Sequence, residues 1–166
     1  MNDHDIEVLA AELGERLLAQ RWRVATAESC TGGLVAGAIT TIAGSSDWFD
    51  RGLVTYSNAA KRELLDVPQS VLDAHGAVSE PTAIAMAEGA LQRSDAALTV
   101  AVTGVAGPGG GTPEKPVGMV CFAWARKDGA TISRTHYLSG NRADVRQASV
   151  AIALRGLIDA VEASSR

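Results

Sequence analysis

Aromatic side chains are scarce in this sequence. Only 4% of its 166 residues are aromatic, whereas 46% are hydrophobic. The core must therefore consist mainly of Ala, Val, Leu and Ile, which suits helices packed closely on a sheet. A chain of this length can bury a core of its own without disulfides or metals. We expect one domain that spans residues 1–166.

Cysteines and histidines are also few. Cys30 and Cys121 are too few for a disulfide framework and lack the spacing of a zinc site. We expect both to be small buried residues. The three histidines, His4, His75 and His136, are scattered along the chain, so we expect neither a Ser-His-Asp triad nor a metal site. The sequence predicts a site without metal or cofactor.

Basic charge and long apolar runs are missing as well. The net charge is −4, so nothing favours binding to nucleic acid or to a membrane surface. Residues 1–7 are polar, unlike a signal peptide. No stretch approaches the run of about 18 apolar residues that a membrane-spanning helix needs. The expected location is therefore the cytoplasm.

Apolar spacing predicts helices that alternate with strands. Helices are expected over 6–17, 34–42, 58–65, a short turn from 68, 79–91 and 142–161, and strands over 23–27, 52–56, 97–105, 118–125 and 131–138. Asn58 and Ser79 are expected to cap the helices that they begin. The last two strands form a hairpin, whereas helices separate the earlier ones. This order predicts a three-layer α/β/α domain with a mixed, mostly parallel sheet.

The run 26–33, Thr-Ala-Glu-Ser-Cys-Thr-Gly-Gly, joins an expected strand to an expected helix. Such a turn holds a side chain above the end of a sheet and leaves backbone N–H groups free for an anion. Ser29 is therefore a candidate nucleophile, and the N–H groups after it are candidate oxyanion donors. A serine in this position is also an ordinary helix cap. The adjacent glycines, Gly32 and Gly33, favour a site because they allow close approach to the backbone.

Tyr56 and Lys61 form a second candidate group, at the end of a strand and in the first turns of the next helix. If the strands are parallel neighbours, both lie above the same sheet edge as Ser29. Lys61 could take the serine proton once burial or another cation lowers its pKa from about 10.4 toward about 7–8. The Tyr56 hydroxyl could relay that proton or orient the lysine. The alternative is a surface lysine beside a half-buried tyrosine.

A glycine-rich loop, 104–118, follows the most apolar strand. It lacks the Gly-Lys-Ser/Thr of a P-loop, and Thr112 stands where a dinucleotide fingerprint needs its third glycine. Its N–H groups can hold a phosphate or an oxyanion. A mobile lid and a flexible connection are equally consistent with three consecutive glycines. The candidate substrate-binding residues of this segment are Thr103, Gly104, Gly107, Gly109 and Gly110.

Arg142 and Arg146 are four residues apart at the start of the last expected helix, so they share one face of it. Cations near a helix N-terminus oppose the helix dipole, and a bound anion would relieve that repulsion. A phosphate or carboxylate ligand is therefore one interpretation. A solvated basic face is the other, and the nearby Asp144 weakens the first.

Four segments in this order resemble the CinA C-terminal domain family. They are 27–33 (AESCTGG), 54–58 (VTYSN) with Lys61, 76–79 (GAVS) and 103–110 (TGVAGPGG), and they span nearly the whole chain. Larger members of the family carry a second, N-terminal domain, and this chain resembles the stand-alone form. The activity of the family is nicotinamide-nucleotide amidohydrolysis, which converts nicotinamide mononucleotide into nicotinate mononucleotide and ammonia.

The resemblance implies roles for the candidate residues. Ser29 would be the nucleophile, Lys61 the general base and Tyr56 its partner, with no metal or cofactor. Thr103 would contact the reacting region. Arg142 or Arg146 would hold the substrate, and Arg142 is preferred.

The same resemblance implies how the rest of the substrate is held. The N–H groups of Cys30, Thr31, Gly32 and Gly33 would stabilise the tetrahedral intermediate. The glycine loop and the arginines would take the phosphate. The pyridinium ring would lie near Glu28 or an aromatic face. A homo-oligomer is also implied. Two physiological roles are open: pyridine-nucleotide salvage, as part of NAD metabolism, and a task tied to DNA uptake, at which the family's name hints.

Two other functions remain open. One is a non-catalytic nucleotide- or phosphate-binding module with the same fold. The other is a serine–lysine amidase that acts on a different amide. A dehydrogenase is disfavoured because Tyr56 and Lys61 are five residues apart rather than four. Whether the glycine loop serves its own site or that of a neighbouring copy is also open.

Overall fold

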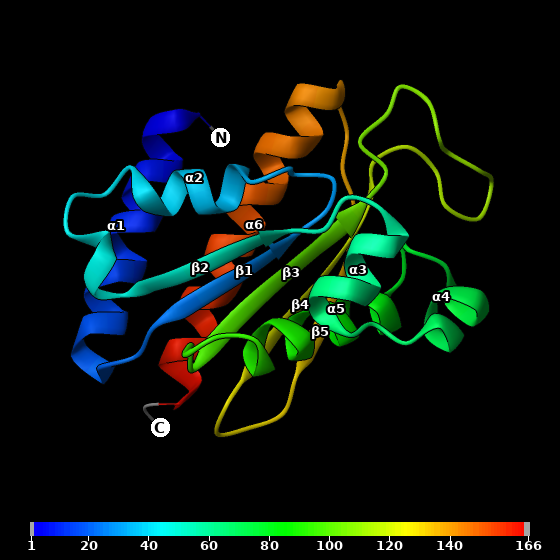
Figure 1. Cartoon of the computed structure of the whole chain (residues 1–166). Helices are drawn as coiled ribbons and strands as arrows, with labels where there is room; N and C mark the ends of the chain where they lie inside the picture. The colour runs from blue at the N-terminus through cyan, green and yellow to red at the C-terminus, as the bar shows by residue number, and fades with distance from the viewer. Residues whose placement is uncertain (1, 165–166) are drawn as a thin grey trace.

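The computed structural model of this chain describes residues 2–164. Helices separate the strands along the first two thirds of the chain, as the sequence predicts (Figure 1). In chain order they are α1 (Asp3–Gln20), β1 (Val24–Glu28), α2 (Leu34–Thr40), the 3₁₀ turn η1 (Ser45–Asp47), β2 (Phe49–Val54), α3 (Asn58–Leu65), α4 (Gln69–His75), α5 (Glu80–Gln92), β3 (Leu98–Gly104), β4 (Met119–Arg126), β5 (Ile132–Tyr137) and α6 (Arg142–Ser164).

The five strands form one sheet in the order β2-β1-β3-β4-β5. β1 is parallel to β2 and β3, and its last residue, Glu28, pairs with Val54 and Val102. β4 is antiparallel to both β3 and β5, so the described strands share one direction except β4. The prediction of a mixed, mostly parallel sheet is therefore confirmed.

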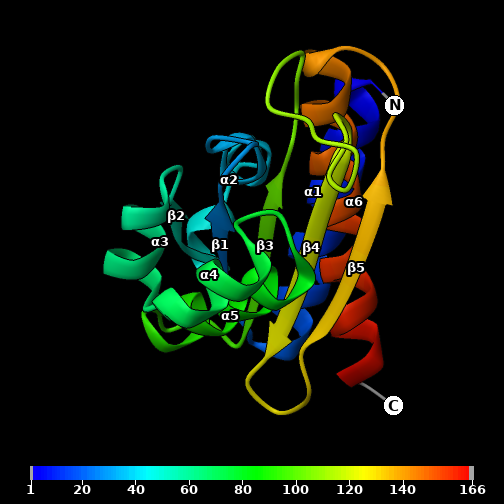
Figure 2. The ribbon, with the colours of Figure 1, turned by 90° about the vertical axis from the view of Figure 1, so that its right-hand side faces the viewer.

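Helices cover both faces of this sheet (Figure 2). On one face, α1, α2 and α6 pack over larger side chains of the strands, among them Val24, Val100 and Phe122. On the other face, α3, α4 and α5 pack over small ones such as Ala27 and Ala101. Because neighbouring residues of a strand point to opposite faces, one strand supplies both sets. The predicted three-layer α/β/α arrangement is confirmed.

Close packing fixes α3, the helix that carries Lys61. Gly89 of α5 faces the end of α3, and a Cβ atom on Gly89 would lie 2.0 Å from the carbonyl oxygen of Leu65. Any larger residue would push α3 outward. α5 is tied in turn to the sheet, because Thr99 Oγ1 of β3 donates to the carbonyl of Ala87 (2.7 Å). Lys61 therefore extends from a helix whose position the packing determines.

Some boundaries differ by one or two residues from the prediction. The spacing predicts Asn58 as the N-cap of α3, but Ser57 has the capping role: its Oγ accepts the N–H of Ala60 (3.0 Å). Serine and asparagine are equally good caps, so the sequence alone does not distinguish them. β2 ends at Val54 rather than Tyr56. Ser79 does cap α5, as predicted, by accepting the N–H of Thr82 (3.2 Å).

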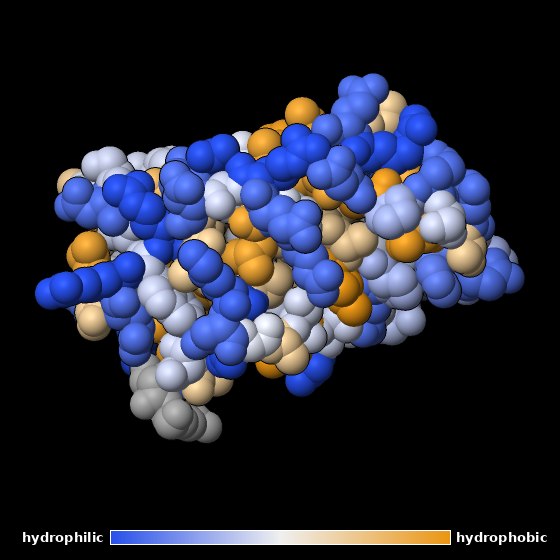
Figure 3. All heavy atoms as spheres, turned by 60° about the horizontal axis from the view of Figure 1, so that its bottom comes forward, coloured by the Kyte–Doolittle hydropathy of each residue, from blue (hydrophilic) through white to orange (hydrophobic). Residues whose placement is uncertain are grey.

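The surface drawn in Figure 3 is mostly hydrophilic, and apolar residues appear there as separate islands. Among the larger apolar side chains that remain exposed are Ile132 and Tyr137 on the edge strand β5. Within residues 2–164, no helix is long and apolar enough to cross a membrane.

Candidate active site

A polar pocket of about 300 Å³ lies beyond the carboxyl ends of β1 and β3. Ligands of open α/β sheets gather at this edge, where the order of the strands reverses. Most of the predicted site residues meet there. The lining residues are Ser29, Cys30, Tyr56, Asn58, Lys61, Ala77, Val78, Thr103, Gly104, Val105, Ala106, Gly107, Gly109, Gly110 and Arg142.

Ser29 directly follows β1. Its N–H donates to the carbonyl of Val102 in β3 (2.9 Å) and so extends the ladder between these strands by one residue. The ladder fixes the backbone that presents the hydroxyl. Ser29 Oγ lies 3.0 Å from Lys61 Nζ and 3.4 Å from the carbonyl oxygen of Tyr56. The prediction that Ser29 and Lys61 share one sheet edge therefore agrees with the geometry.

Lys61 is a buried lysine, with only 1% of its surface exposed. Its Nζ donates to Ser29 Oγ (3.0 Å) and to the carbonyls of Thr55 (2.9 Å) and Tyr56 (3.2 Å). No carboxylate pairs with it among residues 2–164. Burial lowers the pKa of Lys61 below its usual value of 10.5, because a low-dielectric environment disfavours the charged amine.

The backbone of Tyr56 contacts both Ser29 and Lys61. The carbonyl of Tyr56 accepts hydrogen bonds from Lys61 and Ser29, whereas its side chain is 63% exposed at the pocket rim. The hydroxyl makes no hydrogen bond within the described residues. The lysine is oriented, as the sequence suggests, but by a peptide oxygen rather than by the phenol.

Glu28 is buried beneath the turn that follows Ser29. Its carboxylate accepts the Thr31 hydroxyl (2.6 Å) and the N–H groups of Gly33 (3.3 Å), Val35 (2.9 Å) and Ala36 (3.1 Å). These donors compensate for taking a carboxylate out of water. The side chain does not line the pocket. The suggestion that a pyridinium ring lies near Glu28 therefore finds no support in the geometry.

The four expected oxyanion donors divide into two pairs. Gly32 N–H donates to the carbonyl of Ser29 (3.0 Å) and Gly33 N–H to Glu28, so both are occupied. Within residues 2–164, the N–H groups of Cys30 and Thr31 have no acceptor on another residue. Of these two residues, Cys30 lines the pocket, whereas Thr31 has no exposed surface and does not line it. Both glycines have positive φ, 58° and 106°, so their role is to allow the turn.

The thiol of Cys30 lines the pocket but is a poor nucleophile. Burial raises its pKa to about 11, so it is protonated at neutral pH, and a thiol reacts as its thiolate. Cys121 is also buried, in the sheet, as the sequence predicts for both cysteines. Ser29 Oγ, in contrast, lies within hydrogen-bond distance of Lys61 Nζ (3.0 Å).

The two arginines of α6 have different positions. Arg142 lines the pocket, and its Nη1 donates to the carbonyl of Gly107 in the glycine loop (2.8 Å). Arg146 is half-buried behind the turn, where Nε and Nη2 donate to the carbonyls of Cys30 (3.2 Å) and Thr31 (3.3 Å). Only Arg142 of the two is positioned to meet a ligand in this pocket.

The glycine loop forms the far wall of the pocket. Thr103, at the end of β3, is buried and donates from Oγ1 to the carbonyl of Ala77 (2.8 Å). Gly107, Gly109 and Gly110, which the sequence predicts to bind substrate, line the pocket. Outside the pocket, Lys115 Nζ donates to the carbonyl of His75 and connects the loop to α4.

Sequence reasoning missed several lining residues. Asn58 enters the pocket instead of capping α3, and Ala77, Val78, Val105 and Ala106 also line it. The position of Asn58 between Tyr56 and Lys61 is the signal that could have found it. The pocket has two cationic side chains, Lys61 and Arg142, and no acidic one, so it favours an anionic ligand.

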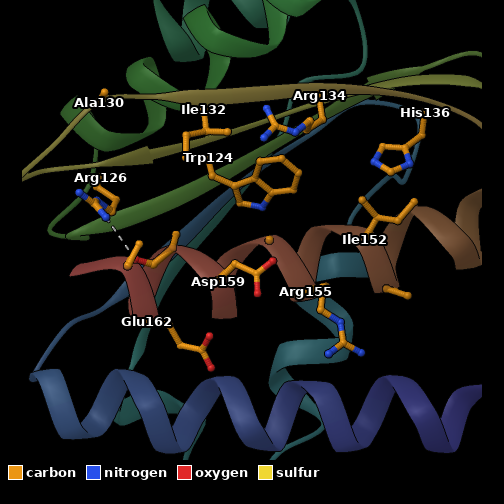
Figure 4. A pocket seen from close by; sticks show the side chains of 14 residues that line it. Trp124, Arg126, Ala130, Ile132, Arg134, His136, Ile152, Arg155, Asp159 and Glu162 are labelled. Carbon is orange, nitrogen blue, oxygen red and sulfur yellow. Dashed lines mark hydrogen bonds between the residues drawn. The ribbon is translucent and has the colours of Figure 1, made fainter. Parts of the chain in front are cut away.

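A larger groove of about 670 Å³ lies between β5 and α6. Figure 4 shows Trp124 pointing from the sheet toward α6, with Arg134 and His136 above and Asp159 below. No serine, threonine, cysteine or lysine lines this groove. Across residues 2–164, no group of three His, Cys, Asp or Glu side chains could hold a metal ion.

Fold and pocket together define an α/β protein with a serine–lysine pair at the carboxyl edge of its sheet. Residues 6–161 match the family model described as the CinA C-terminal domain. The chain belongs to the CinA C-terminal domain family, and the resemblance carried by the four sequence segments is confirmed.

Several relatives are similar over nearly their whole length. A protein of Enterobacter agglomerans named nicotinamide-nucleotide amidohydrolase PncC is 54% identical over 151 residues, which are 90% of this chain and 92% of that protein. The protein of that name from Escherichia coli K12 is 50% identical over 157 residues, or 95% of each chain. The crystal structure of competence/damage inducible protein CihA from Agrobacterium tumefaciens superposes with a TM-score of 0.92 at 50% identity, covering 95% of this chain and 96% of that one.

Proposed function

We propose that this chain hydrolyses the amide of nicotinamide mononucleotide, with Ser29 as nucleophile and Lys61 as general base. The observation that carries this proposal is the 3.0 Å contact between Ser29 Oγ and the buried Lys61 Nζ. The names of the two relatives that match nearly the whole chain support the reaction and the substrate.

Lys61 is well suited to be a base when its amine is neutral. A neutral amine has two hydrogens and one lone pair. The carbonyls of Thr55 and Tyr56 lie 2.9 and 3.2 Å from Nζ and can accept both hydrogens. The lone pair is then directed at the third neighbour, Ser29 Oγ. Because burial lowers the pKa of Lys61, this form is populated at a lower pH than in an exposed lysine.

The reaction then follows in two steps. Ser29 Oγ attacks the amide carbon as its proton passes to Lys61, and the resulting oxyanion accepts a hydrogen bond from the N–H of Cys30. Collapse breaks the C–N bond, Lys61 returns the proton to the leaving nitrogen, and ammonia departs. Water, activated by the same amine, hydrolyses the ester on Ser29 and releases nicotinate mononucleotide.

Arg142 and the glycine loop would hold the substrate phosphate. Arg142 is exposed at the pocket and has no acidic partner within residues 2–164. Guanidinium groups bind phosphate through charge-assisted hydrogen bonds. The loop residues Gly107, Gly109 and Gly110 bring backbone to the same wall. Thr103 would border the reacting carbonyl from the end of β3.

The test is ammonia release from nicotinamide mononucleotide by the wild type and by Ser29→Ala, with and without a chelator. Turnover that is lost in the variant and unaffected by the chelator supports a metal-independent serine amidohydrolase. A folded wild type that binds the nucleotide saturably without turnover would instead indicate the non-catalytic binding module. Turnover of other amides alone would indicate a related amidase.

The wider setting is also a proposal. We infer that residues 1–166 form one domain and that the protein works in the cytoplasm as a homo-oligomer, in pyridine-nucleotide salvage. Light scattering on the purified chain measures the oligomeric state directly, and a monomer that is fully active would contradict the need for a partner copy.

A further inference from the structure

Asn58 is the first residue of α3, and it lines the pocket together with Lys61 of the same helix. Residues three apart on a helix lie on one face of it, so Asn58 is a neighbour of the lysine that contacts Ser29 Oγ. The cap of the helix is Ser57 and not Asn58. Within residues 2–164, the Asn58 side chain makes no hydrogen bond, so its oxygen and its NH₂ group are both available to a ligand.

The polar side chains of this pocket are mostly hydrogen-bond donors. Lys61 and Arg142 are cationic groups, and no acidic side chain lines the pocket. The Thr103 hydroxyl donates to the carbonyl of Ala77. Among the lining residues, Asn58 alone has a side-chain carbonyl oxygen, which accepts hydrogen bonds from N–H groups.

Backbone oxygens near the reacting pair are already engaged. The carbonyl of Tyr56 accepts hydrogen bonds from Lys61 and Ser29. The carbonyl of Gly107, in the glycine loop, accepts one from Arg142. A ligand N–H that enters this pocket therefore finds a free acceptor in the side-chain amide at the start of α3.

The substrate of the proposed reaction brings such donors. A carboxamide has an NH₂ group with two N–H donors, whereas an ester of the same acid has none. In the proposed mechanism Lys61 returns a proton to the leaving nitrogen, so this nitrogen lies on the α3 side of the reacting carbon. The carbonyl oxygen lies on the other side, toward the Cys30 N–H. Because Asn58 shares a helix face with Lys61, its oxygen can accept an N–H of the leaving group.

We propose that Asn58 is a specificity-determining residue that selects a carboxamide: its Oδ1 accepts an N–H of the substrate amide and directs the leaving nitrogen toward Lys61. This inference rests on the proposed function. A site that hydrogen-bonds a polar group of its substrate discriminates against analogues without that group, because its own polar atom is then left unpaired. Asn58 therefore favours the amide over an ester of the same nucleotide.

The test compares nicotinamide mononucleotide with the methyl ester of nicotinate mononucleotide, which differ only in the group that leaves, NH₂ or OCH₃. Both need the same nucleophile and the same base, so the ratio of their kcat/KM values isolates the contact with the NH₂ group. For Asn58→Leu we expect kcat/KM for the amide to fall about tenfold, the worth of one hydrogen bond. The value for the ester should stay as in wild type.

Two further variants make the comparison sharper. Asn58→Asp keeps an acceptor oxygen and loses the NH₂ donor, so its amide-to-ester ratio should remain that of wild type. Its new charge beside Lys61 acts on both substrates and cancels in the ratio. Gln69→Leu is the matched control, because it also removes an exposed side-chain amide from the first residue of a helix, α4, but lies outside the pocket. It should change neither kcat/KM value.

Three results would overturn the proposal. An equal fall for amide and ester in Asn58→Leu would mean that Asn58 serves a shared part of the substrate or the fold. A ratio that falls in Asn58→Asp as far as in Asn58→Leu would mean that the acceptor oxygen is not what selects. Unchanged kinetics in folded Asn58→Leu would mean that the amide does not use this residue. Failure of the proposed function is distinguishable, since the wild type would then release no ammonia from the nucleotide before any variant is compared.

Discussion

Two hollows of this molecule differ in size and in chemistry, and the larger one is not the better candidate active site. The groove between β5 and α6 has a volume of about 670 Å³, more than twice the roughly 300 Å³ of the pocket above β1 and β3. Its walls include Trp124, Ile132 and Ile152, and its charged residues have both signs. The smaller pocket brings together a serine, a buried lysine and exposed loop backbone. Convergent polar groups, and not volume, mark the candidate active site.

The difference follows from the strands that form each hollow. Parallel strands β1 and β3 end side by side, so residues that follow them meet at one edge. The hairpin β4–β5 extends the sheet past its covering helix and leaves an apolar side open. The topology of the sheet thus brings polar residues together in the smaller pocket. The larger groove exists because α6 does not cover the edge strand β5 completely.

After Ser29→Ala, the largest effect is expected from Lys61→Met. Removing the base should lower kcat about 10³-fold. The free energy of unfolding should not fall, because the change removes a buried charge and keeps a side chain of similar length. Assays of ammonia release and thermal unfolding measure the two quantities. Lys127→Met, on the exposed hairpin, is the matched control and should leave both unchanged.

The next largest effect is expected in the pH dependence of kcat/KM for the wild type. The neutral amine of Lys61 is the active form, and burial lowers its pKa from 10.5. We therefore expect kcat/KM to rise about tenfold per pH unit on a limb whose midpoint lies below that usual value. The folded state binds fewer protons than the unfolded state in this window, so stability should rise with pH through it. A midpoint at or above the usual value would contradict the role of Lys61 as base.

Arg142→Met should raise KM for nicotinamide mononucleotide about 10–100-fold, the worth of a charge-assisted hydrogen bond. We expect a much smaller change in kcat, because the phosphate is remote from the reacting carbonyl. Steady-state kinetics separate the two terms. Arg155→Met, in the groove, removes the same charge from the same helix and should leave KM unchanged; an equal rise there would mean that general electrostatics decide the affinity.

The smallest effect is expected in the groove. Ile132→Ser changes an exposed residue of β5, so kcat and KM should be those of wild type and the free energy of unfolding should change by less than about 0.5 kcal/mol. Kinetics and denaturant unfolding check this. A large loss of activity would show that the groove communicates with the pocket or is covered in the active assembly.

The sequence predicts the parts of this molecule that depend on neighbours along the chain. The spacing of apolar residues switches between that of helices and that of strands, and this order predicts the three layers. The turn at Ser29 predicts the sheet edge at which the pocket lies. The sequence does not predict contacts between residues that are distant along the chain. Nothing in the spacing indicates that Arg146 binds the carbonyls of Cys30 and Thr31, or that Glu28 caps α2 from below. Likewise, a tyrosine in a motif suggests its hydroxyl, whereas Tyr56 contributes its carbonyl.

The most direct test of the Ser29 mechanism is a search for the covalent intermediate. Wild-type protein mixed with nicotinamide mononucleotide is quenched in acid within one turnover, digested and analysed by mass spectrometry, beside Ser29→Ala. We predict a nicotinate-nucleotide ester on the peptide that contains Ser29, formed together with a burst of ammonia and absent from the variant. Turnover with no ester on that peptide, or an ester elsewhere that survives in Ser29→Ala, would contradict the assignment of Ser29 as nucleophile.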